Sequence, residues 1–195
     1  MCNFKIVIDT LTKVSLEFTS IPVHTRCVEI LCHLTRFQFN NTYLADNKTL
    51  VETLIACGKS KINEDRLWAL RALQNLTSDG KSKQHLASTS LLTLLSVSAM
   101  RKDEEEQVAA VGSLLNLSTE SANIVPLTNT KSVLATLVHL AHNTNSSFEV
   151  RRMACNTLSN ISLWLQSLAG KGTVPDDVDK VLLPSNVASG WQRWE

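Results

Sequence analysis

Three asparagines recur at a nearly constant interval and carry the side-chain chemistry best suited to binding. Asn75, Asn116 and Asn160 are 41 and 44 residues apart, and His33 stands 42 residues before the first of them. A carboxamide offers an acceptor oxygen and two N–H donors, which match the donor and acceptor of a peptide unit. A row of such groups predicts a ladder that holds the backbone of an extended ligand, or a set of ties to neighbouring backbone within the protein.

The same short motif surrounds each of these four positions and predicts one helix repeated four times. In each copy a leucine lies two residues before the Asn or His position, an aliphatic residue lies one residue after that position, and a hydroxyl residue lies two residues after it. At about 100° per residue, offsets −6, −3, −2 and +1 from the Asn position share one side of a helix. They are largely apolar, and offset −6 is always small: Cys27, Ala69, Ala110 and Ala154. The pattern predicts one buried stripe per copy, against which another helix packs closely.

Further helices are predicted between the copies. Strongly apolar runs cover residues 50–58, 91–99 and 132–142, and residues 1 to about 20 suit a matching first helix. Shorter segments at 40–47, 80–88 and 121–129 suit a third, short helix or a turn. Three helices in a unit of about 42 residues predict an all-α repeat array.

The strings LQNLTS, LLNLST and LSNISL resemble the third helix of armadillo repeats of the importin-alpha and beta-catenin type. The resemblance covers residues 1–168 and implies a right-handed α-solenoid of about four units, at roughly 1–35, 36–77, 78–118 and 119–163. A HEAT-like array is the alternative, since HEAT repeats share the period. Two departures stand out: the first copy carries His33 in place of Asn, and the chain begins in mid-unit. Either the first helix is a cap, or an upstream portion is missing.

The resemblance also implies a concave groove, lined by the third helices, that takes an extended peptide of a partner protein. Asn75, Asn116 and Asn160 would hydrogen-bond its backbone. Side chains at offsets −4 and −7, together with the first-copy histidine, would set specificity. These further candidate residues are Arg26, Glu29, His33, Trp68, Arg71 and Asn156. The alternative function is structural, as a fragment or spacer of a longer armadillo array.

The residues at offset −4 bear on the ligand's charge. In importin-alpha-like proteins this position is commonly Trp, and here it never is, which argues against the usual recognition of basic peptides. Trp68, one turn earlier, would substitute only in part. Arg71 and Arg26, which have Glu29 between them, instead favour an acidic or phosphorylated ligand. The alternative is that both arginines are solvated or paired with nearby carboxylates.

Composition and missing motifs argue against several other functions. The net charge is +1 and no long basic cluster exists, so neither nucleic acid nor an anionic membrane is an expected partner. No nucleophile and base pair, P-loop or glycine-rich phosphate loop is present, which leaves an enzyme as a remote alternative and predicts no cofactor. His139 and His142 lack a third ligand at suitable spacing, so no metal site is predicted.

Three local features complete the predictions. The five cysteines contain no CxxC pair, which favours reduced thiols and a cytoplasmic or nuclear protein. The acidic run 103–106 opens the third repeated helix, where negative charge meets the positive end of the helix dipole; a direct electrostatic contact is the alternative. The predicted irregular tail, residues 169–195, contains Trp191 and Trp194, which are expected to fold back on the last helix; a docking motif and disorder are the alternatives.

Overall fold

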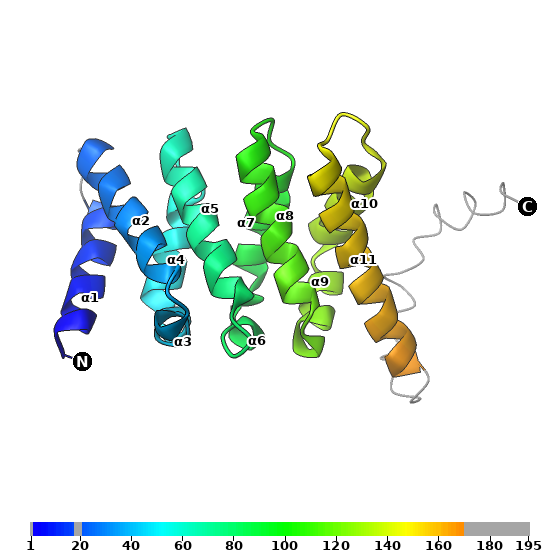
Figure 1. The fold of residues 1–195 in the computed structure, drawn as a ribbon, viewed down its shortest axis with the longest axis horizontal. Helices are drawn as coiled ribbons and strands as arrows, with labels where there is room; N and C mark the ends of the chain where they lie inside the picture. The colour runs from blue at the N-terminus through cyan, green and yellow to red at the C-terminus, as the bar shows by residue number, and fades with distance from the viewer. Residues whose placement is uncertain (1, 18–20, 170–195) are drawn as a thin grey trace, which may run out of the picture.

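The computed structural model describes residues 2–17 and 21–169, and it arranges them as two rows of stacked helices (Figure 1). Each helix of a row packs on the next one of that row. The front row in Figure 1 consists of α2 (Ile21–Thr35), α5 (Asn63–Ser78), α8 (Glu104–Ser118) and α11 (Phe148–Ala169). The second row consists of α1 (Cys2–Glu17), α4 (Lys48–Cys57), α7 (Thr89–Ala99) and α10 (Lys131–His142).

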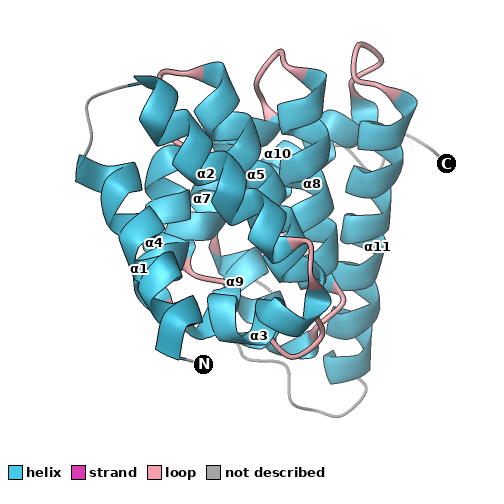
Figure 2. Cartoon of the chain, turned by 60° about the vertical axis from the view of Figure 1, so that its left-hand side comes forward, coloured by secondary structure: helices cyan, strands magenta, loops and turns pink. Residues whose placement is uncertain are grey.

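Short helices connect the two rows along the lower edge of Figure 1. They are α3 (Gln38–Asp46), α6 (Lys83–Leu86), the 3-10 turn η1 (Ser121–Asn123) and α9 (Ile124–Asn129). Figure 2 shows the described residues as helix and loop alone, without a strand. The prediction of an all-α solenoid is therefore confirmed, and the predicted short third helix precedes each of α4, α7 and α10.

The predicted apolar stripe forms the core between the rows. Ala69, Leu73 and Leu76 of α5 are fully buried, as are their equivalents in α8. The small residue at offset −6 is buried in all four copies, as close packing requires. Ile30 of α2 departs from the prediction and is 43% exposed; α2 is the first front-row helix of the described residues, so no front-row helix precedes it.

Side-chain caps fix several helix starts. The Asn47, Ser88 and Asp103 side chains accept hydrogen bonds from backbone N–H groups in the first turns of α4, α7 and α8. Asp79, just after α5, accepts bonds from the Ser82 hydroxyl at 2.6 Å and from its backbone N–H at 3.1 Å. Hydrogen bonding from the Ser82 hydroxyl, the largest effect, lowers the pKa of the Asp79 carboxyl.

The last helix is longer than the repeat predicts. The other front-row helices end two or three residues after the Asn or His position, whereas α11 continues nine residues past Asn160, to Ala169. Trp164 and Leu165 in this extension pack against the core and remain partly exposed. The predicted tail with Trp191 and Trp194 lies outside the described residues, apart from residue 169, which closes α11.

Candidate functional site

The three repeated asparagines lie in register along the front row, and each is tied to the preceding copy. Their Nδ2 atoms donate to the hydroxyl that ends the preceding repeated motif. The bonds are Asn75 to Thr35 Oγ1 at 3.0 Å, Asn116 to Thr77 Oγ1 at 3.4 Å, and Asn160 to Ser118 Oγ at 3.0 Å. Asn116 Nδ2 also lies 3.3 Å from the Gln74 carbonyl oxygen. The Asn of each motif therefore binds the hydroxyl of the preceding unit, and the hydroxyl of that motif is bound by the Asn of the next unit. This explains why the two residue types recur together.

These ties leave part of each carboxamide free. All three side chains are half-buried, and within the described chain no donor reaches the Oδ1 atom of Asn75, Asn116 or Asn160. One acceptor oxygen and one N–H per Asn75 and Asn160 side chain are not engaged. The ties within the array and a ladder for an external backbone are thus compatible.

Trp68 is the centre of a cluster on the front of units 1 to 3, which we call the Trp68 cluster. The Arg71 guanidinium lies 5.3 Å from its ring centroid, and the His33 ring lies 5.5 Å away at an interplanar angle of 53°. Arg71 Nη2 is in turn 2.8 Å from Glu105 Oε2 of α8. The indole is therefore in contact with a cation and an imidazole of the protein itself.

The other charged candidates are also paired with one another. Arg26 forms an ion pair with Glu29, and His33 Nε2 lies 3.8 Å from the second oxygen of Glu29. The two arginines that favoured an acidic ligand therefore have carboxylate neighbours, as the alternative interpretation predicted. Asn156, the remaining candidate, is exposed on α11.

A shallow depression of about 260 Å³ lies between α5 and α8, beside the Trp68 cluster. Gln74, Val108 and Ala109 supply its uncharged lining, and Arg71, Glu104 and Glu105 supply its charges. A Cβ atom on Gly112 would lie 2.3 Å from Gln74 Nε2, so the glutamine side chain occupies the space at offset −4 of the third copy. Gln74 therefore fills the space that a larger side chain at residue 112 would otherwise occupy.

The sequence prediction missed a second ladder of contacts, at the opposite end of the front-row helices. Glu106, at the start of α8, is fully buried and binds Arg66 of α5. Its Oε1 atom is 2.7 Å from Arg66 Nη2 and 3.0 Å from Nε. Arg101 Nε lies 3.4 Å from Oε2. For the acidic run the helix dipole was the main interpretation and a direct electrostatic contact the alternative, and Glu106 of this run does form an ion pair across the junction.

Asp65 occupies the equivalent position in α5 and contacts the preceding unit. It is fully buried, accepts from the hydroxyls of Thr25 and Ser60, and lies 3.1 Å from His24 Nδ1. Cys57 Sγ is 3.9 Å from the other nitrogen of His24. Burial, with Asp65 adding to it, raises the pKa of the Cys57 thiol to about 12. A thiol held neutral and buried is a packing group and not a nucleophile.

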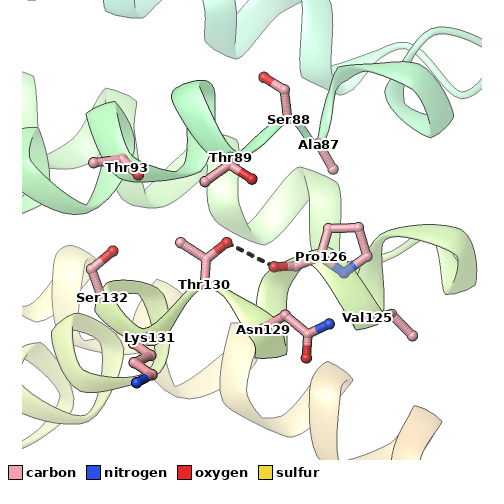
Figure 3. A pocket seen from close by; sticks show the side chains of 10 residues that line it. All are labelled: Ala87, Ser88, Thr89, Thr93, Val125, Pro126, Asn129, Thr130, Lys131 and Ser132. Atoms are coloured by element: carbon pink, nitrogen blue, oxygen red, sulfur yellow. Dashed lines mark hydrogen bonds between the residues drawn. The ribbon is translucent and has the colours of Figure 1, made fainter.

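A second depression, of about 590 Å³, opens between α7, α9 and α10 (Figure 3). Its polar lining is mostly hydroxyl and amide groups, and Lys131 is its single charged residue. Thr130 Oγ1 donates to the Pro126 carbonyl oxygen at 2.9 Å, as the dashed line marks. No candidate residue from the sequence lies there, and its groups form no acid–base pair.

The described residues hold no group of three or more His, Cys, Asp or Glu side chains placed to bind a metal ion. His139 and His142 are both exposed, and His142 Nδ1 lies 2.9 Å from the Val138 carbonyl oxygen. No helix in the described part of the chain has the length and apolar character needed to cross a membrane. Cys27, Cys32, Cys57 and Cys155 are free thiols.

The arrangement was compared with known proteins. No protein-family model matches the chain, and no curated protein matches its sequence. Solved structures do match. A designed armadillo repeat protein aligns with a TM-score of 0.70 at 18% identity, over 89% of this chain and 78% of its own. The chain folds as an armadillo-like repeat array.

Two further structures agree with this armadillo-like fold. A second designed armadillo repeat protein, in complex with the peptide (KR)4, has a TM-score of 0.65 at 21% identity, over 88% of this chain and 77% of its own. An engineered protein has a TM-score of 0.68 at 22% identity, over 91% and 72%. At these identities the likeness concerns the fold, and it favours armadillo over HEAT as the type of repeat.

Proposed function

We propose that this armadillo-like array is a non-catalytic protein-binding module that takes an extended peptide along the front row of helices. The observation that carries the proposal is the register of Asn75, Asn116 and Asn160, whose Oδ1 atoms face no donor among the described residues. Asn75 and Asn160 each offer the donor and the acceptor that one peptide unit needs, and Asn116 offers its acceptor oxygen. The likeness to a designed array in complex with a peptide supports the same use of the fold.

The ligand's charge forms the finer part of the proposal. We infer that an acidic or phosphorylated residue of the ligand binds Arg71 by displacing Glu105. The Arg71–Glu105 pair is exposed, with 35% and 63% of the two side chains accessible, and such pairs contribute about 0–1 kcal/mol. A phosphate with a charge near −2 competes well against a single carboxylate at that site. Arg26, paired with Glu29, offers the same exchange one unit earlier.

The test begins with a ligand selected against the full chain from a displayed library of random 12-residue peptides. The affinity of the selected peptide is then measured for wild type and for the triple variant Asn75→Ala, Asn116→Ala, Asn160→Ala. The matched control changes three exposed polar residues: Ser78→Ala in α5, Thr119→Ala directly after α8, and Ser159→Ala in α11. We expect at least about a tenfold loss for the triple variant and little change for the control. Equal affinities would refute binding through the carboxamides.

Stability has to be measured together with affinity, because each asparagine also forms a hydrogen bond between two units. A loss of about 1 kcal/mol per removed bond is expected, so binding is compared at a temperature where circular dichroism shows all variants folded.

The charge proposal is tested separately with an acidic peptide. Arg71→Glu should weaken its binding and Glu105→Gln should strengthen it, since the latter removes the competitor.

A structural spacer is the second candidate function, and the Asn ties within the array favour it. Under that function no peptide would be selected above background, while the asparagine variants would still lose stability. We further propose a cytoplasmic or nuclear location, on the ground of the free thiols expected in a reducing compartment.

A further inference from the structure

The C-terminal end of the described array leaves an apolar strip of α10 uncovered. Sequence and burial align the second-row helices position by position. In α4 and α7 the residues on the side facing the next unit are Val51, Ile55 and Gly58, then Leu92, Ser96 and Ala99. Of these, Ile55, Gly58 and all three of α7 are buried. The equivalent residues of α10, which we call the end strip, are Leu134, Val138 and Ala141.

The end strip keeps its apolar character although nothing in the described chain covers it. Val138 is 47% exposed, and Leu134 and Ala141 are partly exposed. At the equivalent place in an interior junction, Leu94 of α7 approaches Gly58 so closely that a Cβ there would lie 2.7 Å from Leu94 Cδ2. Covering the exposed apolar side chains of the end strip with an apolar partner would be energetically favourable.

The front row is also less covered at this end than at an interior junction. In α8 the positions that face the next unit are Val111 and Ser118, both buried; in α11 they are Cys155 and Ser162, both exposed. Leu158 of α11 is also partly exposed, whereas the equivalent Leu114 of α8 is fully buried. The uncovered end face is therefore apolar along α10 and mixed in character along α11.

We propose that the C-terminal segment of this chain, residues 178–194, covers the end strip. Val178, Val181 and Leu182 are spaced to share one side of a helix, and Trp191 and Trp194 add two indoles whose burial is strongly favourable. Residue 170 follows α11 directly, and α11 packs against α10. The eight residues 170–177 can span up to about 27 Å, whereas the twelve residues of α10 are about 18 Å long. The segment can therefore reach the whole strip.

The proposal concerns the end of the array and is independent of peptide binding along its front. If it holds, the chain carries its own cover for the last described unit. Terminal units of repeat arrays need such a cover for solubility.

Hydrogen exchange measured by mass spectrometry on the full chain tests this. The variant is Val138→Glu, and the matched control is Val97→Glu, since Val97 is 54% exposed on α7 outside the end strip. We expect residues 178–194 to exchange at least about tenfold more slowly than an unprotected peptide in wild type and in Val97→Glu. Val138→Glu should remove that protection while the helix signal in circular dichroism is retained.

A second variant guards against misfolding of the first. Trp191→Ser with Trp194→Ser changes only the segment, and it should speed exchange along α10. Rapid exchange of residues 178–194 in wild type, or protection that survives in Val138→Glu, would overturn the proposal. So would a dimer, seen by light scattering, that Val138→Glu converts to monomer, because a second copy would then be the occupant.

Discussion

Replacing Glu106 by alanine should weaken the array far more than replacing its neighbour Glu105. Both glutamates pair with an arginine of α5, but the environments differ. The Glu106 and Arg66 side chains are 1% and 8% exposed, whereas Glu105 and Arg71 are 63% and 35% exposed. The two variants therefore compare a buried and an exposed ion pair one residue apart on the same helix.

The magnitude follows from what remains after each change. Without Glu106, the Arg66 guanidinium stays buried with only neutral acceptors, the carbonyl oxygens of Ser60 and Lys61 and the Asn63 side chain. Breaking a buried pair on one side costs about 3–5 kcal/mol. The exposed pair contributes about 0–1 kcal/mol, so Glu105→Ala should change stability by no more than that.

Urea unfolding followed by circular dichroism measures both values. Because stability in a repeat array is a sum over units and junctions, Glu106→Ala should also broaden the transition as the α5–α8 junction uncouples. Replacing both partners, with Arg66→Met and Glu106→Met, should recover much of the loss, since no charge is then left buried. A cost below about 1 kcal/mol for Glu106→Ala, or one equal to that of Glu105→Ala, would refute the assignment of a buried ion pair.

Three further outcomes follow from the structure. Cys155 should react with a thiol reagent in the native protein at least about 100-fold faster than Cys57, whose pKa near 12 and burial keep it neutral; equal rates would contradict this. The lowered pKa of Asp79 means that its carboxylate stabilises the fold above about pH 4 and ceases to do so on acidification. Wild type should therefore lose more stability than Asp79→Asn between pH 6 and pH 3, as urea titrations at each pH would show. Gly112→Ala should be near neutral in wild type, where Gln74 must move, and stabilising by about 1 kcal/mol when Gln74 is alanine, which thermal or urea unfolding can check.

Several parts of the fold were predictable because they depend on residue periodicity. The repeated helix at 65–77 extends from Asn63 to Ser78, and the three apolar runs are α4, α7 and α10. A helix buries whichever side of it is consistently apolar, so spacing alone identifies the stripe. The candidate residues Asn75, Asn116 and Asn160 share an angle on equivalent helices, so the repeat alone predicts that they lie in one row.

What the sequence determined by itself, then, is the repeat, its helices and the side of each helix that is buried. What only the tertiary structure decided is which side chains meet across junctions about 40 residues apart. Arg66 with Glu106, Asn160 with Ser118, Arg71 with Glu105, and Trp68 with His33 are such pairs. Helix periodicity is a property of neighbours along the chain, but the partner of a polar side chain depends on how successive units stack. No local pattern contains that information.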